Sequence, residues 1–294
     1  MAERTKKQRP SAPREEKSTE AETTAPHHAE NTDRLKAELD DLLDPGANFP
    51  ELLKRVGLNP FPANAGSAGV LPHATTCIAL TYDGGVVMAG DRRATAGMAI
   101  SHRTMEKVVQ ADEFSGVAIA GTAGPAMEMI KVFQLQLEYY EKVEGQPLSL
   151  EGKANQLSML VRQNLPAALQ AGIIVVPLFA GFDLLAGRGR LWDFDITGGR
   201  YEERDFVATG SGSTLAGTVL RLGWRQGLTR DEAVALAARS LWEAADADAA
   251  TGGPDVLRGI YPIVASIDAS GWNRVADATL AATYETIMGE VRKR

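Results

Sequence analysis

The chain has 294 residues, 44% of them hydrophobic, and a net charge of −7 from 31 basic and 38 acidic residues. No basic patch or stripe indicates a nucleic-acid-binding protein, and no apolar run approaches the roughly 18 residues of a membrane-spanning helix. Because Cys77 is the only cysteine, the chain has neither an internal disulfide nor a cysteine-based zinc site.

Residues 1–74 differ in composition from the rest and are predicted to form a leader. Residues 1–30 are polar, charged and free of aromatic residues, so we expect them to be disordered, and they lack the apolar core of a secretory signal. Short helices are predicted within residues 32–56, where leucines recur at helical spacing. Residues 58–73, rich in Pro, Gly, Ala and Asn, are predicted to link this leader to a domain spanning residues 75–294.

Strand and helix patterns begin at Thr76. The predicted strands Thr76–Tyr82 and Val86–Ala89 flank Asp83-Gly84, a dipeptide typical of a tight hairpin. The clustering of strands, then helices, then both predicts an α+β fold, with two antiparallel sheets between helix layers. Further strands are predicted near residues 104–110, 115–121, 173–182, 190–194, 206–209, 263–267 and 273–275, and helices near 125–143, 150–169, 214–224, 229–247 and 280–291.

The leader meets the domain at Ala74-Thr75. If the chain is cut there, Thr75 carries both a hydroxyl nucleophile and a free α-amine. An α-amine has a pKa near ~7.7, so it can act as a base at neutral pH. Without such a cut Thr75 merely starts a β-strand, and this stretch alone does not decide between the two interpretations.

Lys107 and Asp91 are candidates for the charges that such a nucleophile needs. A nearby ammonium disfavours protonation of the α-amine and stabilises the developing alkoxide. Lys107 lies among apolar residues of a predicted strand, and Asp91, at the end of the second hairpin strand, is its candidate partner. The alternative is that both are ordinary surface charges.

Two further features are of the kind a threonine nucleophile uses. Gly121 lies in a strand-to-helix turn of small residues whose backbone N–H groups can face a developing oxyanion, although an ordinary tight turn has the same composition. The loops 210–213 and 248–253 carry hydroxyl groups that can hold an amine. Because the first loop lacks the lysine of a P-loop, phosphate binding is a weak alternative.

Only His102 lies in the body of the chain, so neither a Ser-His-Asp triad nor a histidine zinc site can form.

Taken together, these motifs resemble those of a bacterial (actinobacterial-type) proteasome β subunit. The resemblance covers about residues 75–290 and implies the four-layer αββα sandwich of an N-terminal-nucleophile hydrolase, with no cofactor or metal. The motifs are Thr75-Thr76, GDRRAT at 90–95, EKV at 106–108, GSGS at 210–213 and DAATG at 248–252, and the branch is indicated by GRYEER at 199–204 and TGGPD at 251–255.

The resemblance implies a role for each candidate residue. Thr75 would be the nucleophile, exposed when the precursor cuts its own Ala74–Thr75 bond. Asp91 and Lys107 would be its charge partners, and Gly121 would donate the oxyanion N–H. The residues that position the amine would be Ser211, Asp248 and Thr251.

The resemblance also implies a substrate-binding surface. The substrate backbone would bind in extended form at Thr95 and Gly121. The residues matching the specificity pocket are all apolar, which implies cleavage after apolar residues. They are Ala94, Met105, Val109, Ile119, Ala123 and Met127.

Two positions depart from the family pattern. The family usually has glycine before the nucleophile, whereas this chain has Ala74, whose Cβ can crowd the strained turn that self-cleavage needs. We therefore expect slower processing. Thr251 stands where many relatives carry serine, and because the hydroxyl is kept we expect a mild effect.

The family assembles into a four-ring barrel of sevenfold α and β rings. The implied partners are proteasome α subunits, other β subunits, a regulatory ATPase ring and unfolded, tagged protein substrates, and the expected location is the cytoplasm.

The main alternative function is that of a two-ring, ATP-dependent threonine peptidase, but Arg92-Arg93 and the long leader argue against it. A non-catalytic ring subunit would have lost Thr75 or Lys107, and a small-molecule amidohydrolase does not share this set of motifs.

Overall fold

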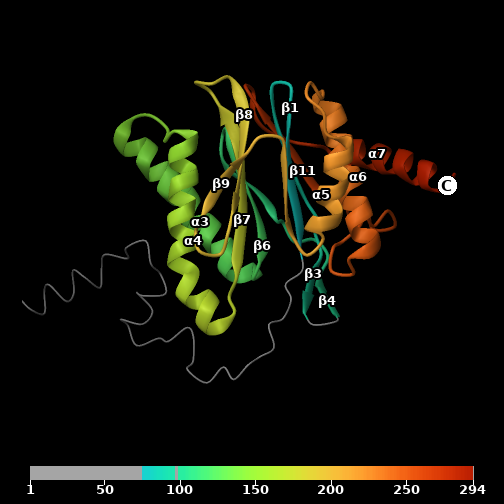
Figure 1. Ribbon diagram of the computed structural model, residues 1–294, viewed down its shortest axis with the longest axis horizontal. Coiled ribbons are helices and arrows are strands. Elements are labelled where there is room, and N and C mark those ends of the chain that lie inside the picture. The colour runs from blue at the N-terminus through green and yellow to red at the C-terminus, as the bar shows by residue number, and fades with distance from the viewer. Residues whose placement is uncertain (1–74, 97–98, 294) are drawn as a thin grey trace, which may run out of the picture. The chain divides into compact units, whose positions relative to one another are not determined.

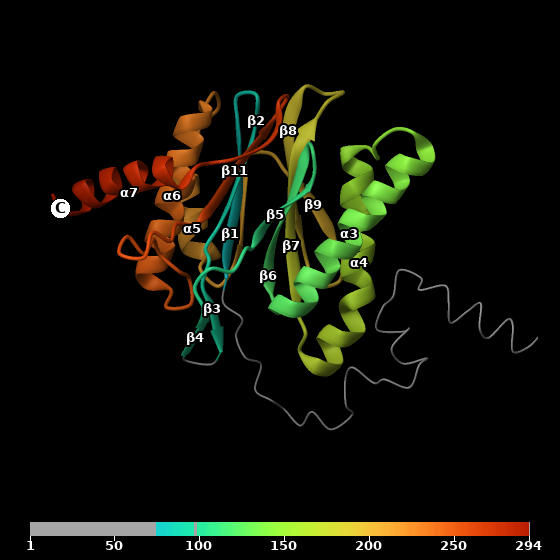
Figure 2. The same ribbon diagram turned by 180° about the vertical axis from the view of Figure 1, so that it is seen from behind.

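The computed structural model describes residues 75–96 and 99–293, so the disordered segment, helices and linker predicted within the leader lie outside the described residues. Two five-stranded antiparallel sheets face each other, and helices cover both outer faces (Figure 1, Figure 2). The predicted α+β fold with two sheets between helix layers is confirmed. Among the described residues, no helix combines the length and apolarity required to cross a bilayer.

The first sheet contains the strand that begins beside Thr75. Its strand order is β10-β1-β2-β11-β12, so β1 and β2 lie near its centre. Two helices, α5 and α6, pack on its outer face, and α7 packs against α6. The strands are β1 (Thr76–Tyr82), β2 (Gly85–Gly90), β10 (Phe206–Gly210), β11 (Ile263–Asp268) and β12 (Gly271–Arg274), and the helices are α5 (Ser213–Gly223), α6 (Arg230–Ala247) and α7 (Asp277–Val291).

The second sheet has the order β5-β6-β7-β8-β9, in which every strand is antiparallel to its neighbour in sequence. Two long helices cover its outer face. The strands are β5 (Val108–Asp112), β6 (Ser115–Gly121), β7 (Val175–Asp183), β8 (Arg188–Phe194) and β9 (Arg200–Glu203), and the helices are α3 (Ala123–Glu144) and α4 (Leu150–Ala171).

The period-two alternation of β1 divides its side chains between two cores. Ile78 and Leu80 pack into the cluster formed with α5 and α6. Cys77 and Ala79 pack into the cluster between the two sheets. Because side chains alternate along a strand, odd-numbered residues of β1 face the other sheet and even-numbered residues face the helices. Thr76, an even-numbered residue, therefore belongs to the helix side.

The structure corrects the predicted strand at 104–110. The strand β5 begins at Val108, so Lys107 immediately precedes it instead of lying within it. The reason is a competing partner: the Met105 N–H donates to the Arg92 carbonyl, and the Arg92 guanidinium donates to the Thr104 carbonyl. These bonds tie residues 104 and 105 to the loop after β2, and pairing with β6 begins at the Lys107 carbonyl.

Three short strands were not predicted from the sequence. They are β3 (Ala94–Ala96), which is partly exposed, and β4 (Ala99–His102) and β9, which are largely exposed. Exposed strands lack the apolar alternation that marks a half-buried strand. The helix predicted near residues 125–143 is present as α3, where Ile130, Phe133 and Leu137 are buried and Tyr140 is exposed.

Candidate active site

Asp91, directly after β2, is the polar centre of the site and is completely buried. Its Oδ1 accepts the backbone N–H of Thr76 at 2.9 Å and lies 2.7 Å from the Lys107 ammonium. Its Oδ2 accepts the backbone N–H groups of Arg93 and Gly252, at 2.8 and 2.9 Å. One carboxylate thus joins the start of β1, the loop before β5 and the loop after α6.

Lys107 is also buried, with 1% of its side chain exposed. Within the described part of the chain, Asp91 is the only hydrogen-bond partner of its ammonium, and an ammonium has three protons to donate. Its own carbonyl accepts the Ile119 N–H at 2.9 Å, which fixes it against β6. The site therefore contains a paired, desolvated cation with donor capacity left over.

Ser211, Asp248 and Thr251 form a second cluster, as the sequence suggested. The Asp248 Oδ2 accepts the Ser211 hydroxyl at 2.5 Å and the Thr251 hydroxyl at 2.6 Å. Burial acts to raise the pKa of Asp248, but these two bonds and the Ala250 N–H outweigh it and hold the pKa below the ordinary value. Asp248 is therefore ionised at neutral pH, and both hydroxyl groups point their protons at it.

Thr75 lies between the two clusters and is buried. Its carbonyl accepts the Ser211 N–H at 2.9 Å. Gly210 makes this approach possible: its φ is +96°, and a Cβ there would come within 1.7 Å of the Thr75 carbonyl oxygen. Only glycine fits such a position.

Gly121 is the last residue of β6, just before α3 begins at Ala123. Its φ of +119° and the Ile174 carbonyl, which would lie 2.1 Å from a Cβ, both require glycine. The Thr122 N–H donates to that same carbonyl. The predicted oxyanion glycine thus occupies a rigid turn at a helix N-terminus.

The structure brings together four of the residues predicted to bind substrate. Met105, Val109, Ile119 and Met127 belong to one apolar cluster between the second sheet and α3. The other three are outside that cluster and partly exposed. They are Ala94 and Thr95, on β3, and Ala123, at the first turn of α3.

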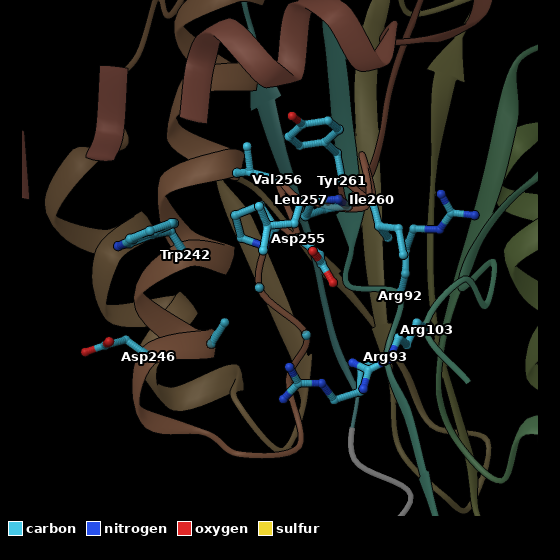
Figure 3. A pocket seen from close by; sticks show the side chains of 15 residues that line it. Arg92, Arg93, Arg103, Trp242, Asp246, Asp255, Val256, Leu257, Ile260 and Tyr261 are labelled. Atoms are coloured by element: carbon cyan, nitrogen blue, oxygen red, sulfur yellow. The ribbon is translucent and has the colours of Figure 1, made fainter. Parts of the chain in front are cut away.

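A pocket of about 470 Å³ shares Arg93 and Gly252 with the site (Figure 3). It lies between α6, which contributes Trp242, and the loop that contains Asp255 and Val256. Neither Thr75 nor Lys107 lines it. It is therefore distinct from the predicted substrate cleft.

Sequence reasoning missed Thr76, Arg93 and Gly252 as parts of the site. Arg93 and Gly252 act through their backbone N–H groups, which residue type does not reveal. The alternation of β1 could have predicted that the Thr76 side chain faces the helix layer. Cys77, the next residue, is not a competing nucleophile. Burial raises the pKa of its thiol to about 12, against the weaker opposing influence of Lys107.

No group of three or more metal-ligating side chains occurs among residues 75–96 and 99–293.

A sequence model described as "Proteasome subunit" matches residues 71–257 of this chain.

Three curated relatives share the name "Proteasome subunit beta". The relative from Acidimicrobium ferrooxidans is 55% identical over 253 residues, or 85% of this chain and 92% of that protein. The Acidothermus cellulolyticus relative is 52% identical over 243 residues (81% and 82%), and the Jonesia denitrificans relative 52% over 218 residues (74% and 72%). The chain therefore belongs to the proteasome subunit family, as a β subunit of the actinobacterial type.

Proposed function

We propose that this β subunit is a threonine-type endopeptidase with Thr75 as its nucleophile. The observation that carries the proposal is the buried Asp91–Lys107 pair, bonded to the backbone directly after Thr75. A buried ion pair costs desolvation energy, so a pair retained next to Thr75 supports a chemical role for its charges at that residue. Residues 1–74 are then a propeptide, and 75–294 the catalytic domain.

The chemistry follows from the positions of the charges. The Thr75 hydroxyl gives its proton to its own α-amine, which the Lys107 charge keeps from being protonated beforehand. The alkoxide attacks the substrate carbonyl, and the Gly121 N–H stabilises the resulting oxyanion. The amine then protonates the leaving amine, and water hydrolyses the acyl ester to restore the hydroxyl.

The free amine must be held so that its lone pair faces the hydroxyl. Ser211 and Thr251 support this role, because both donate their protons to Asp248 and keep lone pairs for other donors. Maturation uses the same nucleophile: the hydroxyl attacks the Ala74 carbonyl, forms an ester in place of the peptide bond, and water cleaves the ester.

The substrate cleft is proposed to bind extended peptide at Thr95 and Gly121. Its specificity pocket would combine Met105, Val109, Ile119 and Met127 with Ala94 and Ala123, and would favour cleavage after apolar residues. Fluorogenic peptides with apolar, basic or acidic residues at the cleaved position test this preference. Fastest turnover of a charged peptide would contradict it.

The subunit is proposed to work in the cytoplasm within a four-ring barrel. Its partners are then proteasome α subunits, further copies of this β chain and a regulatory ATPase ring that delivers unfolded, tagged proteins. Co-expression with the α subunit and determination of particle mass tests the assembly. A particle without sevenfold rings would contradict it.

The direct test of the enzyme is the mass and N-terminal sequence of this chain after co-expression with its α subunit. The wild type is expected to begin at Thr75, and Thr75→Ala to keep its leader and show no peptidase activity. Thr75→Ser, which retains a hydroxyl and an amine, is the matched control and should be cut. An uncut leader in the wild type, or full activity in Thr75→Ala, would refute the proposal.

A further inference from the structure

The side chain of Thr76 has no role in the chemistry proposed above, yet it is fully buried beside the nucleophile. Its Oγ1 lies 2.5 Å from the Thr251 Oγ1 and accepts the Gly212 N–H at 3.0 Å. Gly212 has to be glycine here, because a Cβ would come within 2.4 Å of the Thr76 hydroxyl and 2.9 Å of the Thr251 hydroxyl. The loop before α5 is thus shaped around these two oxygens.

The direction of every hydrogen bond in this group is determined by counting protons. Asp248 is ionised and can only accept, so the Thr251 hydroxyl donates its single proton to Asp248. Thr251 must then accept from Thr76. The one Thr76 proton is thereby used, and its oxygen accepts from the Gly212 N–H. The result is an ordered chain from Gly212 through Thr76 and Thr251 to Asp248.

Thr76 also belongs to the other half of the site. Its backbone N–H donates to the Asp91 oxygen that binds Lys107. Because side chains alternate along β1, its hydroxyl faces the helix layer, whereas Cys77 faces the opposite sheet. The Thr76 hydroxyl therefore cannot reach a substrate in a cleft between the sheets. It can act only through the residues that it holds.

We propose that Thr76 is a positioning residue: its hydroxyl orients Thr251 so that a lone pair of Thr251 faces the Thr75 amine. This inference rests on the proposed function, since it requires Thr75 to react as an N-terminal nucleophile. Without the Thr76 hydroxyl, the Thr251 hydroxyl keeps only its hydrogen bond to Asp248 and can rotate about that hydrogen bond. The Thr75 α-amine then no longer points its lone pair at the Thr75 hydroxyl, while the substrate cleft is unchanged. The turnover number kcat should therefore fall, and KM should stay the same.

The test uses the full chain co-expressed with its α subunit and compares Thr76→Val, Thr76→Ser and Thr209→Val. Thr209 is the matched control, a buried threonine opposite Cys77 on β10. On a peptide with an apolar cleaved residue, Thr76→Val should lower kcat per processed subunit by about tenfold and leave KM within about twofold. Thr76→Ser should restore most of kcat, and Thr209→Val should match the wild type.

Several outcomes would overturn the inference. These are a wild-type kcat in Thr76→Val, a raised KM at unchanged kcat, or a Thr76→Ser variant as slow as Thr76→Val. Failure of both Thr76→Val and Thr76→Ala to assemble, while Thr209→Val assembles, would assign the hydroxyl to folding instead. A leader left uncut in Thr76→Val but removed in Thr76→Ser would support it. A wild type without Thr75-dependent activity would refute the proposed function itself, and the inference with it.

Discussion

Among the residues that the structure describes, Lys107 and Lys153 are buried lysines paired with an aspartate. Comparing the two separates an effect on catalysis from an effect on stability. Lys107 meets Asp91 at 2.7 Å beside Thr75. Lys153, on α4, meets Asp112 of β5 at 2.5 Å. Breaking either pair leaves a carboxylate without its cation and should destabilise the fold, by up to about 3–5 kcal/mol for the more buried pair. Only the first pair adjoins Thr75, the proposed nucleophile.

We therefore predict different effects for Lys107→Met and Lys153→Met. Lys107→Met should abolish leader removal, because the Thr75 hydroxyl loses the cation that stabilises its developing alkoxide. In any processed subunit peptidase activity should fall by about a thousandfold or more, because the freed amine also loses the charge that tunes it. Lys153→Met should lower the thermal midpoint while assembled particles keep their activity. Intact mass, peptide hydrolysis and thermal unfolding measure these effects. Equal loss of activity in both variants would assign Lys107 to the fold alone.

The carboxyl group of Asp248 makes stability depend on pH. Its pKa in the folded state is depressed, because the Ser211 and Thr251 hydroxyls and the Ala250 N–H outweigh the effect of burial. A depressed pKa means that the charged form contributes stability above the ordinary pKa near 3.8, and that this is lost as pH falls through the folded value.

We predict that Asp248→Asn loses less stability than the wild type on acidification from pH 5 to 3. Asp246→Asn, which changes an exposed carboxylate two residues earlier on α6, is the control and should follow the wild-type curve. Thermal midpoints measured at half-unit pH intervals give the comparison. Parallel curves for Asp248→Asn and the wild type would show that these hydrogen bonds do not stabilise the charged form.

At the scale of elements, the site depends on how closely the end of β10 approaches the start of β1. Gly210 has φ +96° and no room for a Cβ against the Thr75 carbonyl. Gly84, in the β1–β2 turn, has φ +102° and nothing within 4 Å of a Cβ. The two glycines have similar φ angles, and only Gly210 has the steric conflict.

We predict that Gly210→Ala and Gly84→Ala share a backbone penalty of about 1 kcal/mol, whereas only Gly210→Ala displaces Thr75. Gly210→Ala should therefore reduce leader removal and peptidase activity by at least about tenfold. Gly84→Ala should be slightly less stable but fully active. A fully active Gly210→Ala would indicate that the β10 loop moves without disturbing the nucleophile.

Several elements and their ends could be predicted because their signals are local. A capping box of Thr229 and Glu232 starts α6, and its Thr-x-x-Glu spacing can be read directly from the sequence. The tight turn at Asp83-Gly84 joins β1 to β2 as predicted. The β3–β4 ribbon could not be found this way, because its residues are partly or fully exposed and follow no apolar pattern.

At the scale of the whole molecule, the two sheets touch through glycines. A Cβ on Gly116 of β6 would come within 2.2 Å of the Trp272 ring on β12. A Cβ on Gly189 of β8 would come within 2.5 Å of the Gly85 backbone on β2. Since Lys107 and Gly121 come from the side of the second sheet and Thr75 from the first, the separation of the sheets sets the width of the site.

We predict that Gly189→Ala forces the sheets apart and costs about 1–3 kcal/mol of folding free energy, with reduced activity. Gly289→Ala, on α7 where a Cβ meets nothing within 4 Å, is the control. It should be neutral or stabilising, because alanine favours a helix over glycine. Chemical denaturation measures both. Equal stability of the two variants would show that the sheets tolerate a wider spacing.

The sequence by itself determined the fold class, because strand and helix periodicity are local properties of the chain. Its motifs and their spacing likewise indicated the family and the candidate residues Thr75, Asp91 and Lys107. Tertiary structure alone decided which groups converge. The backbone N–H of Gly252 reaches Asp91 across 161 positions, and the Thr76 hydroxyl reaches Thr251 across 175. Contacts of such separation depend on how two sheets and their helix layers pack, and backbone donors leave no mark in residue type.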